Sequence, residues 1–385
     1  LSGEIDAASP RLAVTATGRV AMTPRGESEL TIRFHDMSLD PYVRPFVPGL
    51  SPFATAVASG LIRVTGQLAD VDRLAVVGTV DALNMRLFDY TMKNATPIRL
   101  SLENRVVTID ELRLEGEDTS LQLGGRIDLR NERIALRANG DANLAVLQAF
   151  FHDVRGSGRA DLTAAIDGPL REPVFSGRAT IANGRVRHFS LPSSLDAING
   201  VVSFDPRGVR LDELTAMMGG GAVQFGGRIA FEGYVPGELN VTMRGAGVQF
   251  RFPEGVRSMV DADLTLRGNF KAPTLGGSVT VRNAVYTKRI DAPETILDFA
   301  VQRPFEAGGG GSDTTAVATT VPLRYDIQIL VPSTLRIDNN LGRGVANADL
   351  TLRGTYDRPV FFGHAEVERG ELSYKGKRYR MTKGT

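Results

Sequence analysis

The feature that most constrains the fold of this chain is a two-residue alternation of apolar and polar side chains. In Leu239-Asn240-Val241-Thr242-Met243, for example, every second residue is apolar. Successive side chains of a β-strand point to opposite faces, so this period predicts strands with one buried face. A parallel sheet covered by helices would instead show continuous apolar runs with amphipathic helices between them. The alternation therefore predicts an all-β fold.

Two short segments depart from this alternation. Leu144 to Val154 has apolar residues at helical spacing, and Asp40 to Phe53 is rich in proline. We expect each to form a short helical turn that caps or interrupts the sheet, because neither is long enough to build a helical layer.

The chain contains internal repeats. The segment "VTIDELRLEGEDTSLQLGGRIDL" from Val107 matches "VRLDELTAMMGGGAVQFGGRIAF" from Val209 without a gap. A second pattern consists of a glycine, a proline five positions later, a glycine four positions after that, and an alternating strand. It occurs as Gly168/Pro173/Gly177, Gly268/Pro273/Gly277 and Gly354/Pro359/Gly363.

A multi-stranded unit that recurs at about 85 to 100 residues predicts an elongated array in which each unit stacks on its neighbours. We expect an N-terminal β-repeat region with helical and proline-rich interruptions at 1–155, a central β-repeat at 156–260 and C-terminal β-repeats at 261–385, all in one continuous structure. The glycine-rich stretch 306–321 lacks alternation and is expected to be a loop that leaves the sheet. The chain starts without Met and stops in a strand-like alternation, which suggests a piece of a longer protein.

Composition excludes several classes of function. The 45 Lys and Arg nearly balance the 44 Asp and Glu, and they are scattered, so no basic face for nucleic acid is expected. The absence of cysteine removes disulfides and thiolate metal sites, which is compatible with an oxidising compartment. No apolar run is near the roughly 20 residues that span a bilayer, so any membrane anchor would lie outside this segment.

No catalytic or cofactor-binding pattern is found. The histidines lack metal-ligand spacing and are expected at surface or turn positions; they are His35, His152, His188 and His364. No Gly-Lys-Ser/Thr follows the glycine pairs, which leaves them as turn or bulge residues. We expect no cofactor, no metal and no enzymatic activity.

One carboxylate pair is repeated, as Asp110/Glu111 and Asp212/Glu213. Paired carboxylates can serve general acid–base catalysis. Adjacent residues of a strand point to opposite faces, however, so we interpret each pair as part of a repeated structural turn.

Three features together resemble the TamB/AsmA-like family of bridge-like periplasmic lipid transfer proteins. They are the repeated "ADLTLRG…P…G" unit, the motif "SGRATIANGRVRHFSLPSSLDAINGVVSFDPRGVRLDEL" from Ser176 to Leu214, and the closing "GHAEVERGELSYKGKRYRMTKGT". The resemblance covers most of the chain and is strongest from Gly156 to Thr385.

This resemblance implies an elongated, folded-over (taco-like) sheet whose apolar concave groove carries phospholipid acyl chains. It further implies the periplasm of a Gram-negative (diderm) bacterium and a role in outer-membrane biogenesis. The implied partners are the inner membrane, through an anchor outside this segment, and an outer-membrane barrel protein of the Omp85 type, through the C-terminal part.

The resemblance transfers no individual binding residues, but the alternation predicts which side chains would face the groove. These are Leu121, Leu123, Ile127, Leu129, Ile181, Val223, Phe225, Ile229, Phe231, Leu239, Val241, Met243, Leu264, Leu266, Val279, Val281, Leu350, Leu352 and Val367.

Other interpretations use the same residues. A closed β-sandwich would bury them in a dry core. A chaperone-like module for outer-membrane protein assembly would offer strand edges by β-augmentation. A structural β-solenoid or adhesin segment would show a repeat of about 20 to 30 residues with stacked ladders, which is not found. A carbohydrate-active β-helix enzyme would need a cluster of carboxylates, which is missing as well.

Overall fold

The computed structural model of the chain describes residues 2–9, 13–23, 25–44, 51–149, 153–188, 193–232, 235–251, 255–289, 323–340, 342–355, 358–374 and 377–381. Strands make up most of these ranges. The described helices are short: α1 (Asp40–Val43), η1 (Val71–Arg73) and η2 (Leu144–Ala149). The predicted all-β class is confirmed.

The chain divides into two compact units. The N-terminal unit comprises Leu1–Phe189 and Val201–Pro206, and the C-terminal unit comprises Ser190–Gly200 and Arg207–Thr385. Strand β13 (Leu195–Asp205) contributes residues to both. The boundaries expected near residues 155 and 260 fall inside strands β11 and β17. Sequence repeats mark recurring hairpins, which need not coincide with the places where contacts become sparse.

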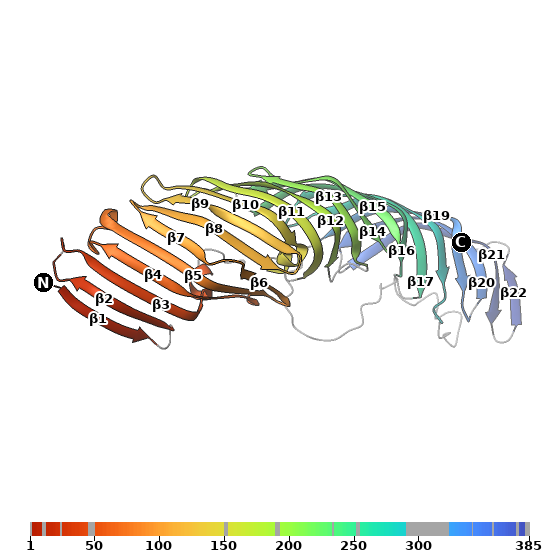
Figure 1. Cartoon of the computed structure of the whole chain (residues 1–385). Helices are drawn as coiled ribbons and strands as arrows, with labels where there is room; N and C mark the ends of the chain where they lie inside the picture. The colour runs from red at the N-terminus through yellow and green to blue at the C-terminus, as the bar shows by residue number, and fades with distance from the viewer. Residues whose placement is uncertain are drawn as a thin grey trace. The chain divides into compact units, whose positions relative to one another are not determined.

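The N-terminal unit is one antiparallel sheet (Figure 1). Each strand pairs with the next along the chain, except around β6 and β7. These two short strands lie between β5 and β8, and each of them pairs with both β5 and β8. Its strands are β1 (Ser2–Ser9), β2 (Val14–Ala21), β3 (Ser28–Ser38), β4 (Ala54–Gly66), β5 (Leu74–Leu87), β6 (Tyr90–Asn94), β7 (Ile98–Glu103), β8 (Val106–Gly116), β9 (Thr119–Asp128), β10 (Arg133–Asn143), β11 (Val154–Pro169) and β12 (Val174–His188).

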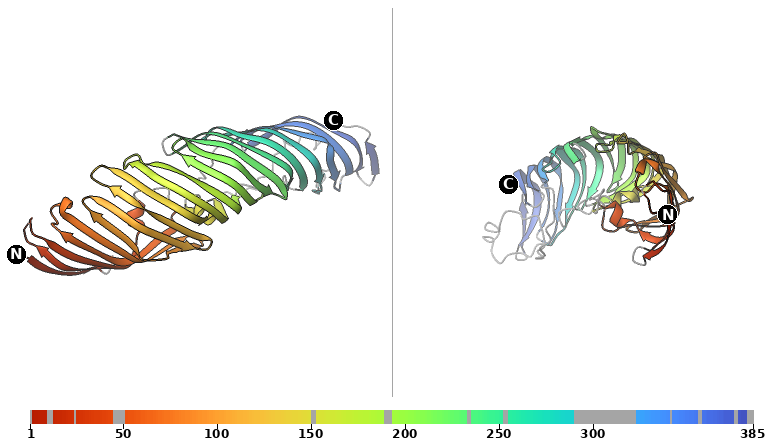
Figure 2. Two further views of the ribbon diagram at one scale, coloured as in Figure 1. Left: turned by 45° about the horizontal axis from the view of Figure 1, so that its top comes forward. Right: turned by 90° about the vertical axis from the view of Figure 1, so that its left-hand side faces the viewer.

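The C-terminal unit is a mixed sheet, and Figure 2 shows its strands side by side in both views. The pairs from β14 to β18 and from β19 to β22 are antiparallel, whereas β18 and β19 run parallel. The strands are β14 (Gly208–Met218), β15 (Gly221–Glu232), β16 (Val235–Phe250), β17 (Val256–Asn269), β18 (Thr274–Tyr286), β19 (Arg324–Asp338), β20 (Gly342–Thr355), β21 (Arg358–Tyr374) and β22 (Lys377–Met381).

The glycine–proline–glycine repeat marks three equivalent hairpins, β11–β12, β17–β18 and β20–β21. Its first glycine ends a strand with positive φ, for example 97° at Gly268 and 95° at Gly354, a region that side chains disfavour. The last glycine permits close approach of the neighbouring strand. At Gly277, whose φ is 127°, a Cβ atom would lie 2.1 Å from the carbonyl oxygen of Asp263.

The repeated Asp-Glu pair is a β-bulge, which corrects the expectation of a turn. Between Ile109 and Leu112 the register of β8 against β9 shifts by one residue, and an equivalent shift occurs between Leu211 and Leu214 of β14. Two residues of one strand therefore oppose a single glycine of the next. The extra residue breaks the alternation locally without ending the strand.

Two helical expectations are partly met. Helix η2 covers 144–149 of the predicted 144–154, and α1 occupies only Asp40–Val43 of the proline-rich stretch. Residues 150–152 and 45–50 lie outside the described residues, as does the glycine-rich stretch 306–321.

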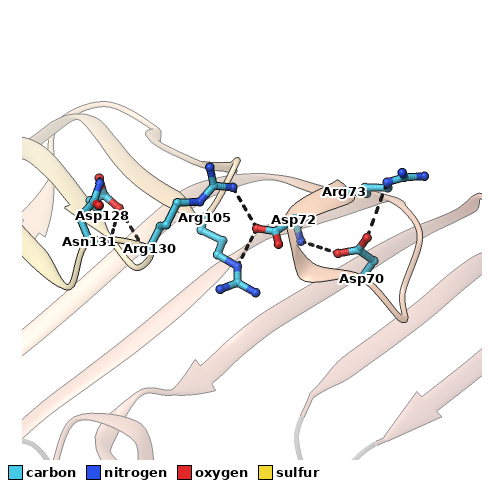
Figure 3. A network of polar contacts seen from close by, with 7 residues as sticks. All are labelled: Asp70, Asp72, Arg73, Arg105, Asp128, Arg130 and Asn131. Atoms are coloured by element: carbon cyan, nitrogen blue, oxygen red, sulfur yellow. Dashed lines mark hydrogen bonds and ion pairs between the residues drawn. The ribbon is translucent and has the colours of Figure 1, made fainter.

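Polar contacts tie together the hairpin turns at one end of the N-terminal unit (Figure 3). The carboxylate of Asp72 in η1 forms ion pairs with Arg105 Nε at 2.7 Å and with Arg130 Nη2 at 3.1 Å. These arginines belong to the β7–β8 and β9–β10 turns, so one carboxylate joins three connections. Asp128 caps the third turn through the backbone N–H groups of Asn131 and Arg130, and these hydrogen bonds lower its pKa.

Candidate functional site

The candidate site is the apolar face of the sheet in the C-terminal unit. Directly opposed residues on neighbouring strands project to the same face, so the register shows which side chains share it. One row crosses β14 to β21 through Leu214, Phe225, Met243, Leu264, Gly277, Ile327, Leu352 and Phe361. The row on one side of it is formed by Ala216, Val223, Gly245, Ala262, Val279, Ile329, Leu350 and Gly363.

These rows contain no charged residue. At about 4.8 Å between neighbouring strands, eight strands give rows about 34 Å long, roughly twice the 15 Å thickness of one lipid leaflet's hydrocarbon layer. The rows therefore form a surface long enough to contact an entire acyl chain.

The side chains of this face pack closely against one another. Val223 is only 2% exposed, Ile327 6% and Leu264 9%. Ala262, Leu264 and Ile327 form a cluster to which Met243, Val279 and Leu352 add partly buried contacts. The strands of the unit belong to one sheet, and no second sheet covers this face among the described residues. The described part of the C-terminal unit is therefore not a closed two-sheet sandwich.

The opposite face of the same strands is polar. Arg244 and Asp263 form an ion pair across β16 and β17 at 3.4 Å, and Arg353 pairs with Asp326 across β20 and β19 at 3.6 Å. Thr265 lies on this face, opposite Thr242. Thr265 therefore lies on the polar face, whereas its chain neighbours Leu264 and Leu266 lie on the apolar face.

The register groups nearly all predicted groove residues of the C-terminal unit on the apolar face. These are Val223, Phe225, Ile229, Leu239, Val241, Met243, Leu264, Leu266, Val279, Val281, Leu350, Leu352 and Val367. Phe231 alternates with Ile229 on β15, but it lies beyond a register shift and opposes Pro236. Their contact with lipid stays a prediction.

The N-terminal unit has an apolar face of the same kind. One of its rows runs through Leu30, Val64, Val76, Leu102, Val107, Ile127 and Ile134. The predicted groove residues Leu121, Leu123 and Ile181 occupy the same face. Leu129 differs, because it follows the end of β9 and is 41% exposed.

Helix η2 packs on part of this N-terminal apolar face, which the sequence does not reveal. Ala145 and Val146 pack against Leu87, Tyr90 and Met92 of β5 and β6. A helical turn was expected here from the spacing of apolar residues. Its docking position was not, since periodicity gives no information on distant partners.

Two carboxylates on the C-terminal unit have lowered pKa values. At Asp261 the main cause is the hydrogen bond from the backbone N–H of Gly247 at 2.9 Å, followed by the side chain of Arg282. At Glu368 the main cause is the hydroxyl of Ser333, and Asn347 Nδ2 also donates at 3.1 Å. Both lie beside register shifts, and Asp261 there accepts a backbone N–H that lies within the shift of β16.

One group of residue types associated with acyl transfer was not recognised in the sequence. Ser59 Oγ lies 3.5 Å from His35 Nδ1, and His35 Nε2 lies 3.3 Å from Asp36. The side chains of His35 and Asp36 are 86% and 69% exposed. Because water surrounds these groups, we assign no catalytic role to them. Among the described residues, no group of three potential metal ligands converges.

A hollow of about 650 Å³ in the C-terminal unit involves mainly the polar face. Its lining includes Thr215, Met217, Ala222, Gln224 and Ala246. Ala222 and Ala246 line it on this face, and Ala216, Val223 and Gly245 of the adjoining apolar row line it as well.

Residues 210–385, which hold all strands from β15 to β22 and most of β14, match the family model of the TamB C-terminal domain. This part of the chain is similar to the TamB C-terminal domain. The resemblance inferred from the repeats is thereby confirmed. No curated protein and no solved structure matches the chain.

The TamB C-terminal domain is a domain of bacterial envelope proteins associated with outer-membrane protein assembly and lipid transport. Within the described residues, no helix combines the length and apolar character needed to cross a membrane.

Proposed function

We propose that the chain is part of a periplasmic bridge that carries phospholipid between the inner and outer membranes and so serves outer-membrane biogenesis. The observation that carries this proposal is the set of apolar rows across β14 to β21, on a face that no second sheet covers in the described part of the chain. The match of residues 210–385 to the TamB C-terminal domain supports the same role at a coarser level.

The physical mechanism is the exchange of equivalent contacts. An acyl chain that leaves water for an apolar surface gains about 0.8 kcal/mol per buried methylene. When successive strands present side chains of similar character, each step along a row replaces one contact by an equivalent one. The tails stay shielded throughout, while the headgroup remains in water.

Carriage by this route involves no covalent step, so we propose that the chain has no enzymatic activity and needs no cofactor. The anchor in the inner membrane would lie outside this segment. We further propose that the C-terminal part meets an outer-membrane barrel protein.

A second candidate function is strand donation to outer-membrane proteins. Among the described strands β22 pairs with β21 only, so its other edge carries backbone groups without a strand partner. Tyr379 on β22 is 49% exposed. Such an edge can accept an additional strand by β-augmentation.

The test of lipid carriage compares two neighbouring positions of β17. Leu266→Asp places a carboxylate in a row of the apolar face, where an acyl chain would pass an unpaired charge at a cost of several kcal/mol. Thr265→Asp adds the same charge one residue away, on the polar face. Lipid recovered with each purified variant is measured by mass spectrometry, and circular dichroism verifies the fold.

We expect Leu266→Asp to lose the lipid bound to the C-terminal unit and Thr265→Asp to retain it. Equal lipid content in both variants would contradict lipid carriage on this face. Strand donation alone would instead predict that both variants bind no lipid and still capture an unfolded outer-membrane protein.

A further inference from the structure

An arginine-rich hollow of about 420 Å³ lies near one end of strands β19 to β22 in the C-terminal unit. Four consecutive strands contribute one arginine each. The charged residues of its lining are Arg336, Arg343, Arg369, Arg380, Asp338 and Glu371.

The strand register holds these side chains on the polar face. Leu335 opposes Ala346, a residue of the apolar face, so its neighbour Arg336 projects to the other side. Arg336 and Arg369 both oppose Val345, one from each flanking strand. The adjoining row contains Asp338, Arg343, Glu371 and Arg380.

The charges of the hollow do not balance. Arg343 Nε is 2.9 Å from Asp338 Oδ1. The side chains of Arg336 and Arg380 have no hydrogen bond or ion pair within the described part of the chain. Four guanidinium groups face two carboxylates, whereas Arg244 and Arg353 on the same face each have an acidic partner across the strand.

We propose that this hollow binds a phosphate-bearing anion through Arg336, Arg369 and Arg380. Neighbouring like charges destabilise a sheet, and an anion between them removes that repulsion. The planar guanidinium group offers paired donors that match two phosphate oxygens, and such charge-assisted hydrogen bonds are the strong ones. The phosphate can belong to a lipid headgroup or to a free anion.

This inference goes beyond the proposed lipid carriage, because the hollow and the apolar rows lie on opposite faces. Arg336→Gln combined with Arg380→Gln removes two arginines without a partner. The matched control combines Arg244→Gln and Arg353→Gln, which removes the same charge from the same face. The probes are inorganic pyrophosphate, in calorimetric titration, and phosphatidylcholine vesicles with or without phosphatidylglycerol, in sedimentation at low salt.

We expect the hollow variant to bind about a hundredfold more weakly than the parent, because it loses two arginines and each charged hydrogen bond accounts for about a tenfold change in affinity, while the control binds like the parent. Binding of pyrophosphate identifies a free-anion site, and binding only of phosphatidylglycerol vesicles identifies a headgroup site. Equal loss in both variants, or a parent that binds neither probe, overturns the proposal. Leu266→Asp should leave this binding unchanged, so failure of lipid carriage is distinguishable from failure of the hollow.

Discussion

At the scale of single residues, Asp261 shows how a carboxylate compensates for an irregular strand. The register of β16 against β17 shifts between Gly245 and Val248, and the N–H of Gly247 there donates to Asp261 Oδ1. Arg282 of β18 forms an ion pair with the other carboxylate oxygen. One side chain thus connects three strands, and both interactions favour its ionised form.

The lowered pKa of Asp261 predicts a pH-dependent contribution to stability. Its stabilising effect is complete above the unfolded-state pKa of about 3.9 and is lost as the pH falls through the lower folded-state value. Asp261→Asn should therefore lower the urea midpoint at pH 7, and the difference from the parent should shrink at the lowest pH at which the parent stays folded.

Circular dichroism is the suitable signal for this measurement, since the chain has no tryptophan. Asp349→Asn is the control, because Asp349 is exposed and has no side-chain hydrogen bond or ion pair among the described residues. A difference between parent and Asp261→Asn that stays constant with pH would refute the assignment.

At the scale of elements, a buried polar network determines where η2 docks. The hydroxyl of Tyr90 donates its proton to the carbonyl of Glu117 at 2.9 Å, and its oxygen accepts a hydrogen bond from the hydroxyl of Thr119. That hydroxyl accepts the N–H of Asn143 at 2.9 Å, and Asn143 Oδ1 accepts the N–H of Ala145 at 2.9 Å. Burial raises the pKa of Tyr90, which keeps its donor proton in place.

Asn143→Ala should release η2 from this network. The variant loses the cap on Ala145 and the hydrogen bond from Asn143 Nδ2 to Glu117, which we expect to cost about 1–3 kcal/mol. Hydrogen exchange in 144–149 should accelerate. Asn139→Ala on the same strand is the control, since Asn139 is exposed. Equal exchange in the two variants would exclude an anchoring role.

These strands and η2 illustrate which features of the fold a sequence can predict. Alternation identifies strands and their faces because side-chain direction is a local property, so the predicted residues of β15 to β17 share one face. The bulges at Asp110 and Asp212 break the period by a single residue, and a repeated Asp-Glu pair is equally compatible with a turn. The parallel pairing of β18 with β19 and the docking of η2 depend on distant partners, which periodicity does not specify.

At the scale of the whole molecule, each unit presents uncharged apolar rows on one of its own faces, and the proposed carriage of lipid requires that these act in series. In a series path one blocked step stops transfer completely, whereas independent binding sites would each contribute a share. Leu123 of the N-terminal unit and Leu266 of the C-terminal unit each lie on an apolar face. They therefore allow one step to be blocked in either unit.

Leu123→Asp and Leu266→Asp should each abolish lipid transfer in the full-length protein, and the double variant should be no worse than either single one. Each single variant should still retain lipid on the unit that carries no new charge, because that unit's apolar contacts are intact. Transfer is measured as phospholipid delivered to the outer membrane, and retained lipid by mass spectrometry of the purified chain. Partial losses that add in the double variant would show that the two faces hold lipid independently and do not conduct it in series.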